Sequence, residues 1–136
     1  MALKIQNYDL GVKTLIPQVN FDDRGFVTEI FRADWTEFFD GVLPKQVNLS
    51  ESKPGIIRAW HRHIRNQIDY FLVKKGKMKI CIYDGDKKSE TFGTLVEIIV
   101  GDDEFKIVKV PGNFWHGTKT VSDIPSETIY FLTNLY

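Results

Sequence analysis

Short β-type runs separated by turn residues recur along most of the sequence, and this recurrence restricts the possible folds more than any other feature. The runs are VKTLI (12–16), FVTEIF (26–31), KQVNLS (45–50), IIRAWH (56–61), IDYFLV (68–73), MKICIYD (78–84), LVEIIV (95–100), FKIVKV (105–110) and ETIYFLTNLY (127–136). Turn signals rich in Gly, Pro and Asp, such as DDRG, SKPG and PGN, lie between them. Many short strands with this punctuation predict a β-sandwich or a β-barrel.

Residues 33–41, with the sequence ADWTEFFDG, form the one stretch with helical character, with Asp34 as a candidate N-cap and Gly41 as a candidate stop. The sequence contains no internal repeat, low-complexity tract or linker, so residues 1–136 are expected to form a single domain. The expected fold is all-β, an antiparallel jelly-roll barrel with one short peripheral helix. Such barrels commonly leave a cavity between their sheets.

The composition allows a buried core and argues against two classes of partner. The chain has 136 residues, of which 43% are hydrophobic, and this suffices for one ordinary core. Eighteen basic and eighteen acidic side chains cancel, so no net charge draws the protein to nucleic acid or to an anionic membrane. The sequence shows neither a basic-plus-apolar leader nor an apolar run as long as a membrane span, so we expect a cytoplasmic location.

The stretch GIIRAWHRHIRNQ (55–67) contains two histidines that are separated by one residue on a predicted strand. Residues two apart on a strand face the same side, so His61 and His63 are expected to project together. Gln67 follows after a short loop, and His116 lies on a later predicted strand, so three imidazoles and one amide oxygen could form a metal site. Seven residues have a spacing that resembles the two signature motifs of the cupin superfamily. They are Gly55, His61, His63, Gln67, Gly76, Pro111 and His116.

Two features argue against a metal ion. Gln67 stands where metal-binding cupins usually have a glutamate, whose charge helps to neutralise a divalent cation. Arg58, Arg62 and Arg65 crowd the same segment, and such a cationic shell disfavours a metal ion and favours a phosphate. We therefore expect no metal and no other cofactor. If a metal is present, its predicted ligands are His61, His63, Gln67 and His116.

Five segments together resemble one enzyme family in order and spacing. They are FDDRGFVTEIFR, QVNLSESKPGIIRAWH, SETFG, NFWHG and IYFLTNLY. The family is that of the dTDP-4-dehydrorhamnose 3,5-epimerases, and the resemblance covers residues 21–136. It implies a jelly-roll homodimer that inverts carbons next to the ketone of a dTDP-4-keto-6-deoxyhexose, in deoxysugar or surface-polysaccharide biosynthesis. A base removes the proton alpha to the carbonyl, a cation or hydrogen-bond donor stabilises the enolate, and an acid returns a proton on the opposite face, without a metal.

The resemblance assigns roles to individual residues. His61 in RAWH matches the family's base, and Tyr130 in IYFLT matches its proton donor. Arg24 and Arg58 match arginines that grip the diphosphate, and guanidinium groups fit phosphate oxygens in bidentate fashion. Because Arg58 and His61 are an odd number of residues apart, either a β-bulge brings them to one face or one of them serves a second subunit. The other matched residues, which are expected to line the nucleotide or sugar pocket, are Glu29, Gln46, Asn48 and His116.

Two departures from the family affect the catalytic groups. Asp69 stands at the position of a lysine that steadies the enolate, and the aspartate that orients the family's catalytic histidine lies in a C-terminal extension beyond the match to Tyr136. An ionised carboxylate cannot stabilise an enolate. Either His63, Arg62 or Arg65 supplies the positive charge, or Asp69 orients a histidine, and His63 and Asp69 are therefore predicted as catalytic residues.

Three other functions stay open. RAWHRH also resembles the R-x-x-H-x-H element of the sugar 3,4-ketoisomerases, compact cupins in which a histidine pair moves a proton between adjacent carbons of dTDP-4-keto-6-deoxyglucose. The others are a metal-dependent cupin and a barrel that binds a sugar nucleotide without catalysis. Because QVNLS, SETFG and WHG resemble the epimerases more, we expect a nucleotide-sugar epimerase or a closely related isomerase.

Overall fold

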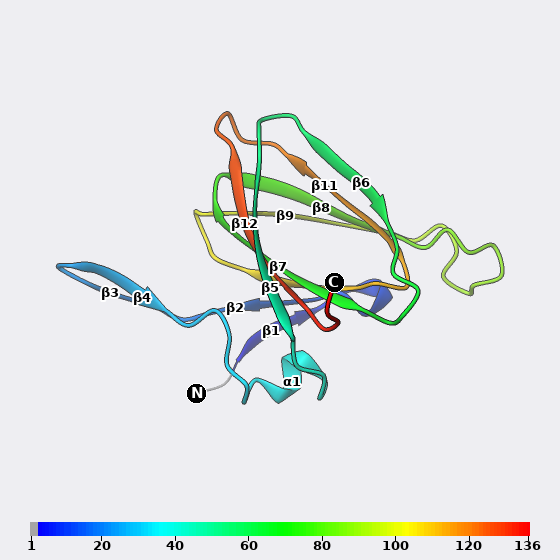
Figure 1. Cartoon of the computed structure of the whole chain (residues 1–136), viewed down its shortest axis with the longest axis horizontal. Helices are drawn as coiled ribbons and strands as arrows, with labels where there is room; N and C mark the ends of the chain where they lie inside the picture. Colours follow the sequence, from blue (N-terminus) through cyan, green and yellow to red (C-terminus); the bar gives the residue numbers. More distant parts are fainter. Residues whose placement is uncertain (1–2) are drawn as a thin grey trace.

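The computed structural model describes residues 3–136 and contains two facing antiparallel β-sheets and a projecting hairpin (Figure 1). The larger sheet consists, in spatial order, of β1 (Lys4–Asn7), β2 (Lys13–Ile16), β10 (Ile107–Pro111), β7 (Ile68–Lys75), β12 (Ser126–Leu132) and β5 (Gln46–Ser52). The smaller sheet consists of β6 (Ile57–His61), β11 (Trp115–Thr120), β8 (Lys77–Tyr83) and β9 (Leu95–Gly101). The hairpin consists of β3 (Val19–Asp22) and β4 (Gly25–Thr28). The predicted all-β antiparallel architecture is confirmed.

The main core lies between the two sheets and follows from strand alternation. In β9, Val96, Ile98 and Val100 are buried, while the residues between them are exposed. Ile80 of β8 lies directly opposite Ile98, so the apolar side chains of both strands share one face. This face packs against the larger sheet, whose core side chains include Phe71, Val73, Val108 and Val110.

A second apolar cluster covers the outer face of the larger sheet. Tyr70 and Leu72 of β7 point to this face and pack with Phe38 and Phe39 of α1 (Thr36–Phe39). Rings of Phe39 and Tyr70 meet edge to face with centroids 4.9 Å apart. Strand β7 is therefore covered on both faces, which explains why its sequence reads as a nearly continuous apolar run.

The helix is shorter than the segment predicted from the sequence. Its N-cap position is occupied by Trp35, and the predicted N-cap Asp34 instead accepts a hydrogen bond of 2.8 Å from Arg32. It ends at Phe39, and its C-cap residue Asp40 has a left-handed backbone (φ 51°), one residue before the predicted stop Gly41. The amines of Lys13 and Lys109 both donate to the Asp40 carboxylate and so attach the helix end to the sheet. Tertiary contacts, not an N-cap, hold this helix.

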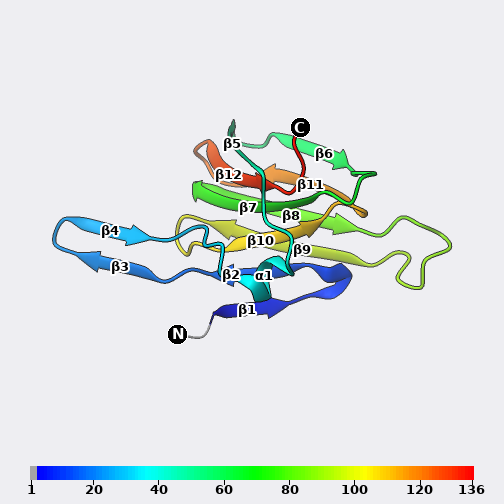
Figure 2. The ribbon, with the colours of Figure 1, turned by 60° about the horizontal axis from the view of Figure 1, so that its bottom comes forward.

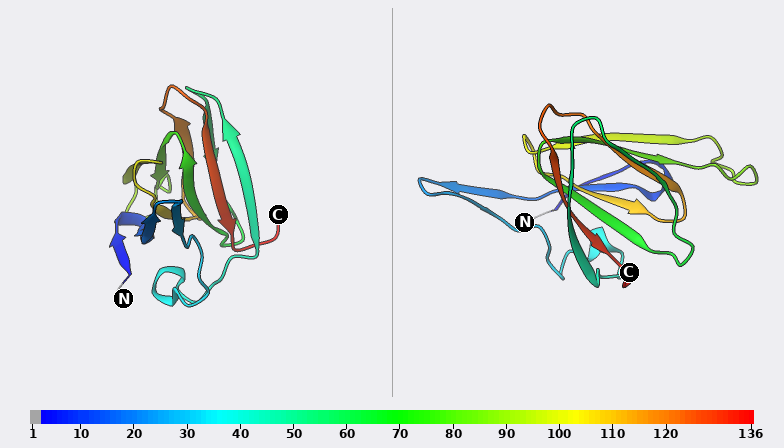
Figure 3. Two further views of the ribbon diagram at one scale, coloured as in Figure 1. Left: turned by 90° about the vertical axis from the view of Figure 1, so that its left-hand side faces the viewer. Right: turned by 45° about the horizontal axis from the view of Figure 1, so that its top comes forward.

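Several strand boundaries differ from the sequence prediction. The run 26–31 is a strand only as far as Thr28, and the last run leaves the sheet after Leu132. Strands β1 and β3 lie outside the nine predicted runs, and β11 is the later strand that was predicted to carry His116. Figures 2 and 3 show that the hairpin β3–β4 and the loop between β8 and β9 project from opposite ends of the molecule. No helix within residues 3–136 has the length and apolar character needed to span a membrane.

The burial of Phe38 predicts a large stability loss when its ring is removed. The Phe38→Ala variant should lower the free energy of unfolding by about 3–5 kcal/mol, because removal of the fully buried ring leaves a cavity beside Tyr70 of the sheet. Urea denaturation followed by circular dichroism measures this change. The matched control is Ile99→Ala on the exposed face of β9, which should change stability by no more than about 0.5 kcal/mol. Equal effects of the two substitutions would contradict the described packing.

Candidate active site

A cavity of about 250 Å³ lies between the sheets, at the end where β5, β7 and β12 face β6 and β11. Of the residues predicted to take part in catalysis, His61, His63, Asp69 and Tyr130 all line it. Tyr130 comes from the larger sheet and His61 from the smaller sheet, so an imidazole and a phenol approach the same space from opposing sheets. The predicted pair therefore shares one compartment within a single chain.

A β-bulge in β6 brings Arg58 and His61 to the same cavity. His61 lies opposite His116, but Arg58 lies opposite Thr118, so three steps along β6 match two steps along β11. This resolves the two possibilities left by the odd spacing in favour of the bulge. Gly117 permits the close approach of the strands, because a Cβ at this position would lie 2.5 Å from the Cβ of Ala59.

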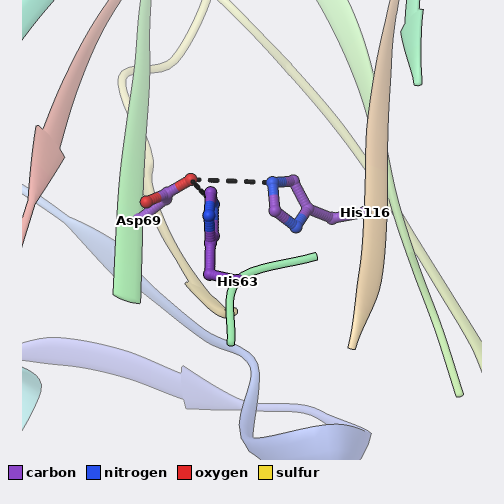
Figure 4. A group of neighbouring side chains, drawn as sticks. All are labelled: His63, Asp69 and His116. Carbon is purple, nitrogen blue, oxygen red and sulfur yellow. Dashed lines mark hydrogen bonds and ion pairs between the residues drawn. The ribbon is translucent and has the colours of Figure 1, made fainter. Parts of the chain in front are cut away.

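A buried carboxylate organises the side chains at one end of the cavity. The Oδ2 atom of Asp69 lies 3.1 Å from Nε2 of His63 and 3.6 Å from Nε2 of His116 (Figure 4). Its other oxygen, Oδ1, accepts a hydrogen bond of 2.8 Å from the amide of Gln67. Asp69 and Gln67 belong to β7 or the residues just before it, whereas His116 belongs to β11, so the cluster joins the two sheets. Sequence spacing alone could not predict these contacts.

His116 is the most deeply buried histidine of the site. Burial lowers its pKa to about 4, although the negative charge of Asp69 opposes this shift. The ring is therefore neutral at pH 7, and its Nδ1 atom has no hydrogen-bond partner among residues 3–136. The ring centroids of His61 and His63 lie 6.0 and 5.3 Å from that of His116. Both of these imidazoles belong to residues that are more exposed than His116.

Close backbone packing fixes the loop that carries His63. The amide of His63 donates a hydrogen bond of 2.7 Å to the carbonyl of Gly112. A Cβ atom at Gly112 would lie 2.1 Å from the carbonyl oxygen of Gln67 and 2.9 Å from Cδ2 of His63. The glycine of the PGN turn is therefore required by the position of the imidazole.

The predicted binding residues divide between the cavity and its surroundings. Arg58 lines the cavity, donating from Nε to the hydroxyl of Ser52 over 2.7 Å, and Asn48 lines it as well. Gln46 lies beside the cavity, where its amide donates to Asn48 over 3.0 Å and its oxygen accepts from the backbone N–H of Tyr136 over 2.8 Å. Gln46 is placed to orient Asn48.

Arg24 and Glu29 lie away from this cavity. Arg24 stands at the tip of the β3–β4 hairpin, where its side chain is 86% exposed and forms an ion pair with Asp22. Glu29 follows the hairpin and lines a second cavity with Arg32, to which it is also paired at 3.3 Å. Within one chain, the structure does not bring these two residues to His61.

The metal ligands predicted for the case that a metal is present, namely His61, His63, Gln67 and His116, differ from the possible ligands that the structure brings together. The donor atoms within 4.8 Å of one another belong to His63, Asp69 and His116. Gln67 turns its amide nitrogen, not its oxygen, toward Asp69. Two imidazoles and a carboxylate suit a divalent transition metal, but the same atoms also satisfy one another by hydrogen bonding.

Sequence reasoning missed several side chains of the cavity wall. Ser50 and Ser52 follow Asn48 at every second position of β5, so strand alternation predicts all three on one face. Thr128 stands two residues before Tyr130 on β12 and follows the same rule. The C-terminal Tyr136 reaches the cavity from beyond the last strand, and no local pattern indicated this position.

A sequence model of the dTDP-4-dehydrorhamnose 3,5-epimerase family matches residues 9–136. The chain belongs to this family. Its relatives include a probable low-salt glycan biosynthesis epimerase of Haloferax volcanii, which is 41% identical over 129 residues that cover 95% of this chain and 80% of the relative. A spore coat polysaccharide biosynthesis protein of Bacillus subtilis is 32% identical over 128 residues, covering 93% of this chain and 81% of that protein.

A solved structure of the epimerase family shares the fold. The dTDP-6-deoxy-D-glucose-3,5-epimerase of Legionella pneumophila, crystallised with dTDP-4-keto-L-rhamnose, superposes with a TM-score of 0.88 at 26% identity. The alignment covers 99% of this chain and 73% of the Legionella chain. The predicted jelly-roll fold and family are confirmed, and the chain is an enzyme of the isomerase class.

The close contacts around Gly112 allow the geometry near His63 to be tested by substitution. The Gly112→Ala variant should lose about 1–3 kcal/mol of unfolding free energy, because the added methyl group forces the Gln67 carbonyl and the His63 ring to move. Thermal and urea denaturation measure the loss. Asn113→Ala, at the exposed neighbouring position, is the control and should stay within about 0.5 kcal/mol of the wild type. A fully stable Gly112→Ala protein would show that the loop lies elsewhere.

Proposed function

We propose that the enzyme inverts one or more carbons next to the ketone of a dTDP-4-keto-6-deoxyhexose, for the synthesis of a glycan or surface polysaccharide. The observation that carries this proposal is that His61 and Tyr130 line one cavity from opposing sheets. The family assignment favours epimerisation over ketone migration, over a metal-dependent cupin reaction and over binding without catalysis. The sugar nucleotide held by the Legionella relative supports the class of substrate.

The proposed reaction requires two proton transfers on opposite faces of the sugar. The imidazole of His61 takes the proton from the carbon next to the ketone, and the C–H electron pair moves into an enolate. Tyr130 then donates its phenolic proton to the opposite face of that carbon, which inverts the centre. The Tyr130 ring packs against Phe71 with centroids 5.8 Å apart, so the phenol is held in place by an apolar neighbour.

The remaining polar residues of the cavity are proposed to bind the substrate. The guanidinium of Arg58 retains donors beyond those that meet Ser52 and the Glu51 carbonyl, and these fit a diphosphate. Asn48 and His116 supply hydrogen-bonding atoms at the cavity wall, and Gln46 orients Asn48.

We further propose that the enzyme works as a homodimer in which the β3–β4 hairpin reaches the cavity of the second chain. The hairpin exposes Phe21, Phe26 and Val27 to solvent, with 77%, 52% and 69% of their surfaces accessible. Contiguous exposed apolar side chains on a projecting hairpin favour burial against a partner. This arrangement would bring Arg24 and Glu29 to a site that they do not reach within their own chain. The cytoplasmic location stays a prediction.

Mixing two inactive variants tests the shared site. His61→Asn disables the cavity, and Arg24→Ala disables the hairpin, so a hybrid dimer contains one site with both residues intact. An equimolar mixture that is unfolded and refolded together should recover about a quarter of the wild-type rate, as expected for random pairing in a two-fold dimer. Each variant alone should stay inactive. A mixture with no activity above its components, or a wild type with the mass of one chain in light scattering, would contradict the proposal.

Incubation with dTDP-4-keto-6-deoxyglucose in deuterated water tests the reaction itself. We expect deuterium at carbon 3 or carbon 5 with the ketone still at carbon 4, as detected by NMR. Migration of the ketone to carbon 3 would instead indicate a ketoisomerase. A complete absence of exchange would exclude both reactions on this substrate.

Substitution of Tyr130 separates the two proton transfers. Tyr130→Phe should retain deuterium exchange, because His61 can return a deuteron to the face from which it took the proton. Inversion should fall by about 10²- to 10⁴-fold, since the acid on the opposite face is missing. NMR of the product measures exchange and inversion in the same sample. Equal loss of both would show that Tyr130 acts before proton abstraction.

A further inference from the structure

His61 and His63 differ in how the structure holds their rings. Among residues 3–136, no hydrogen bond fixes the His61 ring, which stands at the end of the edge strand β6. His63 instead faces the buried Asp69 carboxylate, with Nε2 and Oδ2 3.1 Å apart (Figure 4). An imidazole that donates a hydrogen bond from one N–H to a carboxylate keeps its second nitrogen free and correctly oriented for proton transfer. By this geometric criterion, His63 is the better prepared of the two bases.

We infer that His63, oriented by Asp69, is a second acid–base residue of this site and takes a proton from the sugar ring through Nδ1. The inference rests on the proposed function and adds a catalytic group to it. The His63 side chain lines the same cavity as His61 and Tyr130 and is 22% exposed, so it combines access to the substrate with a fixed ring. Asp69 does not touch the substrate in this scheme and is a positioning residue.

The surroundings of Asp69 explain why its charge acts on His63. Asp69 is 5% exposed, and a buried charge requires a hydrogen-bonding or charged partner. His116 is also within reach, but its burial keeps it neutral, so it cannot balance the charge. Gln67 donates to Oδ1 and leaves Oδ2 for the imidazoles. The Nε2 atom of His63 therefore faces a fixed acceptor, which holds the ring in one orientation.

The proton and electron balance of the step is simple. The bond from carbon to hydrogen breaks, its electron pair moves into the enolate, and the proton binds Nδ1 of His63. The Nε2–H group continues to donate to Asp69, which stays ionised. A proton from Tyr130 reaches the opposite face of the carbon, and the imidazolium later returns its proton to solvent or to the phenolate. No oxidant, reductant or additional group is required.

Chemical rescue distinguishes proton transfer from a purely structural role. His63→Ala should slow deuterium exchange at the sugar carbon that His63 serves by about 10²- to 10⁴-fold, the usual contribution of a general base. Free imidazole added to this variant should restore part of the rate in a saturable manner, because it can occupy the space left by the ring. Wild-type enzyme treated with chelator should keep its full exchange rate.

Asp69→Asn provides a second variant of nearly unchanged shape. It should lower kcat while leaving KM within a factor of two or so, because the carboxylate orients the base and does not bind substrate; the loss can reach about 10⁴-fold in serine protease triads. Asp69→Glu should recover part of the rate. The matched control is Ile64→Ala, which removes an exposed side chain next to His63 and should leave exchange unchanged. Circular dichroism confirms that each variant folds.

The possible outcomes separate this inference from the proposed function. Wild-type exchange with an unaffected His63→Ala variant would overturn the inference and leave His61 as the base. A loss that imidazole does not relieve, together with an unchanged kcat in Asp69→Asn, would also overturn it. So would a metal ion bound stoichiometrically by His63, Asp69 and His116 whose removal abolishes exchange. Absence of exchange in the wild type would overturn the proposed function itself.

Discussion

The division of the inner space between an apolar half and a polar half is the constraint on which this molecule depends. Along β7, Asp69, Phe71 and Val73 point into the same interior, so one strand passes from the polar half to the apolar half. The apolar half is filled by side chains of β8, β9 and β10. The polar half contains the cavity, which is lined by a carboxylate, imidazoles and hydroxyls. The side chains that form the apolar core and those that line the cavity therefore lie at different ends of the same interior.

Much of the fold and part of the site could be predicted from the sequence by periodicity. Alternating apolar residues indicated most strands, and the same rule placed Asn48 with Gln46. His61 and His63 do line one cavity, but β6 ends at His61 and His63 lies on the loop that follows, so the predicted strand alternation is not the reason. The helix prediction was wrong in its boundaries, because contacts of Phe38 and Phe39 with the sheet decide where the helix lies, and a local cap does not. Because three positions separate Arg58 from His61, regular strand alternation would place them on opposite faces. Only the pairing of β6 with β11 reveals the bulge that brings them to one face.

The contacts around Asp69 were beyond sequence reasoning for a different physical reason. They depend on a loop between β6 and β7, on Gly112 from a distant turn and on His116 from the other sheet. No periodic sequence pattern predicts such contacts between residues that are distant in the chain. The family resemblance raised two possibilities for this residue, a loss of positive charge or a role in orienting a histidine. The hydrogen bond of 3.1 Å to His63 agrees with the second, and no described contact links Asp69 to His61.

The bulge in β6 also affects how such sites can be found in other chains. Arg58 and His61 share a face here although three positions separate them, because the extra residue resets the alternation. A homologous chain with one residue fewer at this point would have regular alternation and would still present both side chains to the interior. The separation of the two residues in an alignment is therefore free to vary by one, and a search pattern with fixed gaps would overlook enzymes with the same arrangement in space.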